Sequence, residues 1–167
     1  DYIAKAVELG QTAIAFTEHG NIYQWVAKKM ACDKAGLKYL HGCEVYLTEK
    51  LLLTDPRTGE QNKVRDNYHT ILIAKNYAGL QEMNELISRS NQGDHFYYKP
   101  RITFDEFLGI SSNVIKISAC LASPLNRMSI THPMYERLLK HYDYLEIQAH
   151  DHPEQVAYNR HLAEMSQ

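Results

Sequence analysis

Short apolar runs alternate with segments of helical period along most of the chain, and this alternation limits the fold more than any other feature. The runs that are predicted to form strands cover residues 12–17, 37–47, 68–75, 113–119 and 144–148. Such alternation is typical of βαβ units, so we expect an α/β fold with a largely parallel sheet. Five strands are too few to close an eight-stranded barrel, and a smaller or incomplete one is expected instead.

Segments with helical spacing of apolar residues separate these runs. A helix is predicted over residues 23–35, others around Leu80 and Leu138, and a last one that opens at Pro153, where the missing N–H costs little. Residues 48–67 are rich in turn formers and are predicted to be an exposed loop.

Composition and charge narrow the class of protein. The chain has 167 residues, of which 44% are hydrophobic and 23% charged, which is the balance of a globular domain and excludes disordered and fibrous classes. Its net charge of -2 argues against an autonomous nucleic-acid binder, and no apolar run approaches a membrane span. Cys32, Cys43 and Cys120 are an odd number with no zinc-ribbon spacing, which favours a reducing compartment and a cytoplasmic location.

Glu18 and His19 stand directly after the first predicted strand, in TEHGN, where Gly20 and Asn21 can supply a tight turn. The carboxyl ends of parallel strands line the ligand site in α/β folds, so an acid and an imidazole at this point suit metal or phosphate chemistry. The alternative is that both side chains cap the following helix.

Glu44 is an acid inside an otherwise apolar strand, in HGCEVY. An unpaired carboxylate buried there would lose several kcal/mol of solvation free energy, so Glu44 requires a cation. A buried arginine would serve, whereas a metal ion would also account for the nearby histidines.

Three further residues are candidates for the same chemistry. His69 lies at the beginning of YHTILIAK, which fits the carboxyl-end rule poorly, and a lone strand histidine is more often a core residue. Cys120 closes NVIKISAC and could be either a thiolate ligand or a small buried hydrophobe. His150 ends YLEIQAH, and the same two interpretations compete.

Metal-binding residue types thus recur at four of the five predicted strand ends, which favours one shared metal site. Its mixture of carboxylate, imidazole and thiolate donors suits zinc, manganese or iron. Such a site, open to water, would activate hydroxide and hold phosphate oxygens, which is the chemistry of a phosphoesterase.

The segments TEHGN, GCEVYL, YHTILIAKN, FYYKPRI, ISACLAS and LEIQAHDHPEQ occur in an order that identifies a family. Over nearly its whole length the chain resembles the PHP (polymerase and histidinol phosphatase) domain of bacterial DNA polymerase III alpha subunits. The resemblance implies a single PHP domain over residues 1–167, folded as a distorted, incomplete (β/α)7-type barrel. It also implies a cleft that holds up to three divalent metal ions in the complete domain.

Carried over residue by residue, the resemblance predicts the metal ligands His19, Glu44, His69 and Cys120. It gives Glu18, which stands where the family usually has aspartate, and His150 accessory catalytic roles. The family's His-any-His pair would lie before Asp1 and its Asp-any-His pair after Gln167. Fewer metal ions and weaker binding are therefore expected for this chain.

Three functions are compatible with the resemblance. In the first, the parent is a DNA-directed DNA polymerase, a nucleotidyltransferase of DNA replication. This domain is then a metal-dependent phosphoesterase, which in some family members is proposed to proofread as a 3′-5′ exonuclease. The isolated chain is then expected to be inactive. In the second, the domain is a silent scaffold for the polymerase module and a proofreading exonuclease subunit. The third is a free-standing phosphatase. DNA is an expected partner through the parent polymerase, and a membrane is not.

Overall fold

The computed structural model describes residues 2–166. The helices are α1 (Tyr2–Glu8), α2 (Trp25–Lys34), α3 (Tyr77–Ser90), α4 (Phe104–Leu108), α5 (Pro124–Arg127), α6 (Tyr135–His141) and α7 (Pro153–Met165), with the 3-10 turn η1 (Gly93–His95). The strands are β1 (Ala13–Phe16), β2 (Lys38–Thr48), β3 (Leu52–Thr54), β4 (Gln61–Lys63), β5 (Tyr68–Ala74), β6 (Phe96–Tyr97), β7 (Lys99–Thr103) and β8 (Val114–Ile117).

The long strand β2 is the centre of a mixed sheet in the order β6-β7-β2-β5-β8, with β1 also paired to β2. β1 runs parallel along the first part of β2 and β7 runs parallel along its last part. β5 is antiparallel to β2, and β8 is antiparallel to β5. The prediction of a largely parallel sheet is therefore wrong. Parallel neighbours need a crossover connection, usually helical, whereas the segment between β2 and β5 folds back on itself as the hairpin of β3 and β4.

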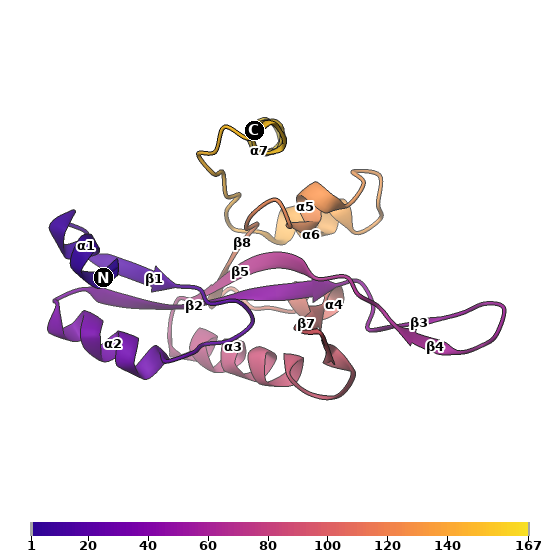
Figure 1. The fold of residues 1–167 in the computed structure, drawn as a ribbon, viewed down its shortest axis with the longest axis horizontal. Coiled ribbons are helices and arrows are strands. Elements are labelled where there is room, and N and C mark those ends of the chain that lie inside the picture. Colours follow the sequence, from indigo (N-terminus) through magenta and orange to yellow (C-terminus); the bar gives the residue numbers. More distant parts are fainter. Residues whose placement is uncertain (1, 167) are drawn as a thin grey trace.

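That hairpin lies in the segment 48–67, which was expected to be a loop. β3 and β4 pair antiparallel within it, and Figure 1 shows them extending away from the body of the molecule. The strand predicted over 144–148 is also wrong: an isolated bridge between Ile117 and Tyr144 is formed there, and Tyr144 and Ile147 are exposed. Leu145 packs against the main core, but with Tyr144 and Ile147 exposed the segment has no continuous buried face, and only the isolated bridge forms.

A short strand and helix that the apolar pattern did not predict follow α3. β7 runs directly into α4, whose start is fixed by a capping box in which Thr103 and Glu106 bond each other's backbone N–H groups. The signal was present in the sequence as Thr-any-any-Glu.

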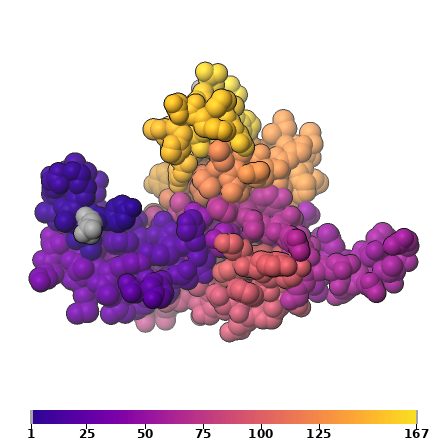
Figure 2. Space-filling model, in the orientation of Figure 1, coloured from indigo at the N-terminus to yellow at the C-terminus, as the bar shows by residue number. Residues whose placement is uncertain are grey.

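The main core lies between the sheet and its covering helices. Side chains from β2 and β5, such as Leu47 and Leu72, pack with Met83 of α3, Phe107 of α4 and Leu138 of α6. Figure 1 shows α3 on one side of the sheet and α5, α6 and α7 on the other, and Figure 2 shows this last group as a raised lobe. The fold is mixed α/β, and the sheet over residues 2–166 is open. Within the same residues, no helix is both long enough and apolar enough to span a bilayer.

Candidate metal centre

His19 reaches Glu44 because the chain after β1 continues alongside β2. β1 pairs with β2 as far as His41, and β7 pairs with β2 from Tyr46 onward. The segment after β1 occupies the interval between them: the Glu44 N–H donates to the Glu18 carbonyl, and the Gly20 N–H donates to the Glu44 carbonyl. His19 thereby lies directly beside Glu44 on the neighbouring strand.

Gly20 makes this close approach possible. Its φ is 71°, in the left-handed region that glycine adopts without strain. A Cβ at this position would lie 2.7 Å from Cγ of Pro100 and 3.0 Å from Cε2 of Tyr46. The tight turn predicted at Gly20 is thus confirmed, and the turn packs directly on β7 and β2.

The antiparallel direction of β5 explains why His69 belongs to the same group although it begins its strand. β5 runs opposite to β2, so its first residues lie beside the end of β2, with His69 opposite Tyr46. β8 runs opposite to β5, so the end of β8 meets the start of β5. Cys120, just beyond β8, therefore arrives next to His69, whose backbone N–H donates to the carbonyl of Ala122.

The four predicted metal ligands form one contiguous group, called here the four-residue cluster: His19, Glu44, His69 and Cys120. Nδ1 of His19 is 2.8 Å, and Nδ1 of His69 is 2.9 Å, from the same oxygen, Oε1 of Glu44. The Sγ of Cys120 lies 3.4 Å from Nδ1 of His69. The Glu44 side chain is only 11% exposed, whereas that of His19 is 71% exposed, so the cluster opens to solvent on the His19 side.

The contacts shift the pKa of each buried member. Burial alone raises the pKa of Glu44, but hydrogen bonds from His69 and His19 outweigh it and hold that pKa below its ordinary value. Hydrogen bonds to Cys120 and Glu44 raise the pKa of His69 to about 9. The His69 contact lowers the pKa of the Cys120 thiol, which favours the thiolate, the form that binds metals.

The donor chemistry of the four-residue cluster fits a divalent metal. One carboxylate, two imidazoles and a thiol are the ligands that zinc and its neighbours accept. The donor atoms contact one another directly, and no group of three or more His, Cys, Asp or Glu side chains within residues 2–166 is arranged to hold an ion as it stands. Metal binding would therefore require the imidazoles to exchange their bonds to Glu44 for bonds to the metal.

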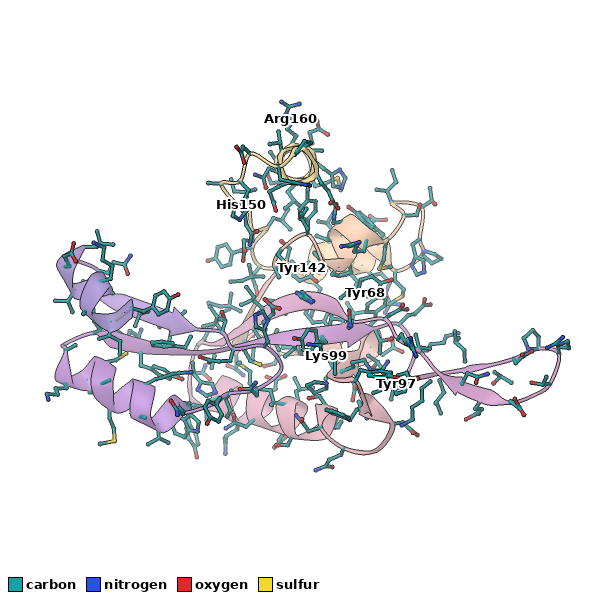
Figure 3. The ribbon with its side chains drawn as sticks, in the orientation of Figure 1. Tyr68, Tyr97, Lys99, Tyr142, His150 and Arg160 are labelled. Atoms are coloured by element: carbon teal, nitrogen blue, oxygen red, sulfur yellow. The ribbon has the colours of Figure 1, made fainter. Side chains whose placement is uncertain are left out.

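Glu18 and His150 lie outside the cluster. The Glu18 carboxylate forms an ion pair with Lys28 of α2, so it points away from Glu44 although the two backbones are bonded. Neither Glu18 nor His19 caps α2, whose N-cap residue is Gln24. His150 is exposed on the segment before α7, where its backbone N–H donates to Gln148, and Figure 3 shows it beside the raised lobe.

Sequence reasoning missed Tyr46 as a neighbour of the cluster. Its ring centroid is 5.1 Å from that of His69, in an edge-on arrangement. Because side chains two apart on a strand share a face, the pair Glu44 and Tyr46 was already visible in GCEVY. Lys28, the partner of Glu18, had no comparable signal, since its position depends on how α2 packs.

Similarity to known proteins shows the family to which the chain belongs. The PHP domain profile matches residues 1–150. The chain belongs to the PHP domain family. It is 30% identical over 177 aligned residues to DNA polymerase III subunit alpha of Borreliella burgdorferi, and equally to that of Aquifex aeolicus, covering 99% of this chain in both cases. The alpha subunit of Campylobacter jejuni is 34% identical over 119 residues, or 71% of this chain.

The PHP chain spans a small part of these relatives: 15% of the Borreliella and Aquifex proteins and 9% of the Campylobacter protein. Among solved structures, a proposed metal-dependent phosphoesterase from Bifidobacterium adolescentis has a TM-score of 0.63. The match covers 98% of this chain and 76% of the other at 12% sequence identity, so it shows that the two share a fold.

Proposed function

We propose that this PHP domain is the amino-terminal phosphoesterase-like module of a bacterial-type DNA polymerase III alpha subunit that acts in DNA replication in the cytoplasm. The parent enzyme would be a nucleotidyltransferase, and DNA and the polymerase module would be its partners. The identity to alpha subunits over nearly the whole chain supports this assignment. In the parent, the open sheet would be part of the distorted (β/α)7-type barrel.

Within that module, the four-residue cluster is the proposed metal site, and its convergence is the observation that carries the proposal. His19, Glu44, His69 and Cys120 would hold zinc, manganese or iron, with fewer ions than the three of a complete domain. When bound, the metal would supply an activated water and neutralise charge on the phosphate. The proposed reaction is hydrolysis of a phosphodiester at the 3′ end of DNA.

The chain's own residues have different roles in the proposed site. Glu44, fixed in the middle of β2, orients both imidazoles through one oxygen. His69 is held between Glu44 and Cys120 and is mostly buried. His19 stands at the solvent side, where a phosphate would approach. Glu18 is proposed to keep Lys28 beside the turn, and His150 is proposed to have an accessory role.

The test is release of nucleotides from a 5′-labelled single-stranded oligonucleotide by the parent polymerase, with manganese or zinc added. We expect metal-dependent shortening from the 3′ end, and its loss in both His19→Ala and Glu44→Ala. Elemental analysis of the purified protein should show bound metal that these substitutions remove. If both variants degrade the 3′ end as fast as wild type, the chemistry takes place elsewhere.

A second candidate function is a catalytically silent scaffold that supports the polymerase module and a proofreading exonuclease subunit. The direct donor-to-donor contacts in the cluster favour it, because they stabilise the fold without an ion. Titration calorimetry separates the two: a scaffold would bind neither zinc nor manganese, and Glu44→Gln would change only stability.

A further inference from the structure

A group of tyrosines and basic side chains lies beside the four-residue cluster and is not used by the function proposed above; Tyr98 is exposed, Tyr97 half-buried and Tyr46 buried. We call it the tyrosine track, and it consists of Tyr46, Lys63, Arg65, Tyr97, Tyr98 and Lys99. It is built from β2, the end of the β3-β4 hairpin and the turn between β6 and β7. Figure 3 shows Tyr97 near the end of the sheet from which the hairpin extends and Lys99 nearer the middle of the sheet.

Cations lie over the aromatic rings throughout the track. The guanidinium of Arg65 is 5.1 Å from the ring centroid of Tyr98, and Nζ of Lys63 is 5.8 Å from that of Tyr97. The Tyr97 and Tyr98 rings are themselves 4.6 Å apart. Surfaces that bind single-stranded nucleic acid combine aromatic rings with cations. Bases stack on the rings, and phosphates pair with the cations.

Tyr98 is displayed to solvent at a conformational cost. Its φ of 59° lies in the left-handed region, which costs a non-glycine residue of order 1 kcal/mol, and its side chain is 69% exposed. Burial in the core does not compensate for this strain. A large ring held outward in an unfavourable conformation is typical of a residue that contacts a ligand.

The track is continuous with the cluster. Nζ of Lys99 is 5.1 Å from the ring centroid of Tyr46, which in turn meets the His69 ring. Pro100, the next residue, lies against the Gly20 turn that positions His19. A strand bound along Tyr98 and Tyr97 would therefore reach the open side of the cluster past Lys99.

We propose that the tyrosine track binds single-stranded DNA, with bases stacked on Tyr97 and Tyr98 and phosphates paired with Arg65 and Lys99, so that a 3′ end is delivered to the cluster. The identity of the delivered end rests on the proposed function. Single strands fit better than duplex because two adjacent rings can stack only on unpaired bases. Lys63 contributes less, since it also pairs with Asp94 at 3.4 Å.

Binding is tested by fluorescence anisotropy with a labelled oligothymidine, in low salt and with metal chelated. Tyr98→Asn removes the ring but tolerates the left-handed backbone, and we expect it to weaken binding about fivefold or more. Tyr98→Phe should bind within about twofold of wild type. The matched control is Tyr77→Asn, which removes an equally exposed tyrosine at the start of α3.

The basic residues are tested by the salt dependence of the same binding. Each phosphate contact that is lost should reduce the slope of log affinity against log salt by about 0.7 for a single strand. We expect this change for Arg65→Ala and Lys99→Ala, and not for Lys140→Ala, which removes an exposed lysine of α6. If wild type fails to bind at about 100 µM protein, or if Tyr97→Ala and Tyr98→Asn both bind as wild type does, the track is not a DNA site.

Failure of the track can be told apart from failure of the proposed function. Glu44→Gln should bind the oligonucleotide as wild type does, because the cluster is not needed for stacking. Tyrosine-dependent binding without any metal-dependent hydrolysis would contradict the proposed phosphoesterase and leave the track in place. Oligonucleotide hydrolysis that is unchanged in Tyr97→Ala and Tyr98→Asn would overturn the track alone.

Discussion

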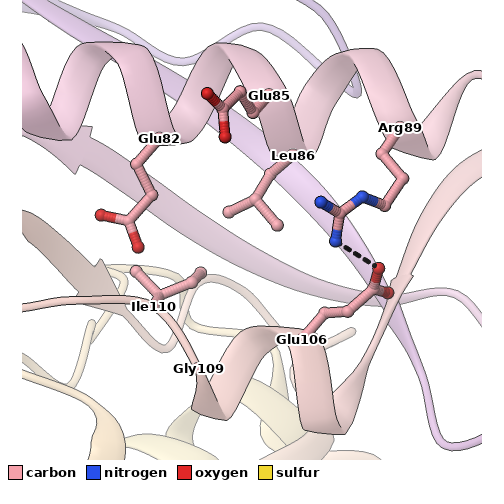
Figure 4. A pocket seen from close by; sticks show the side chains of 7 residues that line it. All are labelled: Glu82, Glu85, Leu86, Arg89, Glu106, Gly109 and Ile110. Carbon is pink, nitrogen blue, oxygen red and sulfur yellow. Dashed lines mark hydrogen bonds and ion pairs between the residues drawn. The ribbon is translucent and has the colours of Figure 1, made fainter.

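Two glutamates of this domain are both largely buried and both contact histidine, yet their surroundings differ. Glu106 at the start of α4 receives the backbone N–H of Thr103 at 2.8 Å, the hydroxyl of the same residue at 3.0 Å and a guanidinium N–H of Arg89 at 3.2 Å. His95 lies 3.1 Å from its Oε1. Figure 4 shows the Arg89 contact where α3 passes α4.

Glu44, by contrast, sits in the middle of β2 and its Oε1 contacts two imidazoles. The Glu106 carboxylate is fixed by the Thr103 backbone N–H and hydroxyl, which cannot leave without loosening the start of α4. An imidazole that gives up its proton can turn and bind a metal, because a neutral ring nitrogen is a common ligand. At His69 the metal would have to displace the proton that the raised pKa favours. A buried acid is therefore a candidate for a metal site only when its partners can exchange their bonds.

The two carboxyl groups have a lowered pKa for different reasons. Burial raises the pKa of both, and this is the largest single effect. In Glu106 the Thr103 backbone N–H and hydroxyl, with Arg89, overcome it. In Glu44 the two histidines do so. A lowered pKa by itself therefore does not separate a structural acid from a functional one.

The largest effect that separates the two sites is expected in catalysis. Glu44→Gln keeps the size of the side chain but removes the charge, and we expect metal-dependent hydrolysis by the parent polymerase to fall about 1000-fold or more, since a metal supplies several kcal/mol of transition-state stabilisation. Glu106→Gln is the matched control and should retain activity within about threefold. Equal losses in the two variants would show that the comparison is mistaken.

Metal binding should also distinguish the Glu44 and Glu106 variants through its effect on the free energy of unfolding. A ligand that binds only the folded state adds about 2.7 kcal/mol to the free energy of unfolding at 100 times its Kd. We expect zinc or manganese to stabilise wild type and Glu106→Gln in chemical unfolding, and to leave Glu44→Gln unchanged. Stabilisation of all three proteins to the same degree would place the bound ion outside the cluster.

The sequence was sufficient to predict the cluster but not the sheet that builds it. His19, Glu44, His69 and Cys120 were predicted as ligands, and the structure brings them into contact; their metal-binding role stays a prediction. The carboxyl-end rule assumes parallel strands, and His69 at the start of β5 contradicted it. The antiparallel β5 removes the contradiction, because its first residues meet the end of β2.

Strand direction could not be predicted because apolar periodicity is the same for both directions. It depends on the connection. The β3-β4 hairpin within 48–67 is mostly exposed, and its apolar run at 51–53 is short and is followed by turn formers, so the segment was predicted to be a loop. The apolar pattern over 144–148 predicted a strand that does not form, because Leu145 packs on the core while Tyr144 and Ile147 stay exposed. The contact of Lys99 with Tyr46 was not predicted because it joins elements that are distant in the chain, and that of Lys28 with Glu18 because it depends on how α2 packs.

A smaller effect should appear when the local support of Glu106 is removed. Thr103→Ala deletes the N-cap hydroxyl of α4 and one bond to Glu106, and such caps contribute about 1 kcal/mol. We expect a loss of that size in urea unfolding, with metal affinity unchanged. Thr103→Ser, which keeps the hydroxyl, should lose less than half as much. A change in metal affinity would show that α4 and the cluster are coupled.

The smallest expected effect is the pH dependence of the Glu106 site. The folded pKa of Glu106 lies below its ordinary value of 4.5, so the folded state binds its proton less readily than the unfolded state does. Its contribution to stability is therefore complete above about pH 5 and is lost as the pH falls through the folded pKa.

Wild type should lose more free energy of unfolding than Glu106→Gln between pH 5 and pH 3, about as far as acid unfolding can be followed. Other carboxylates titrate in the same range, but they do so in both proteins, and the difference between the two curves isolates Glu106. Parallel curves would mean that the bonds from Thr103 and Arg89 do not favour the ionised carboxylate, and the contrast with Glu44 would then rest on geometry alone.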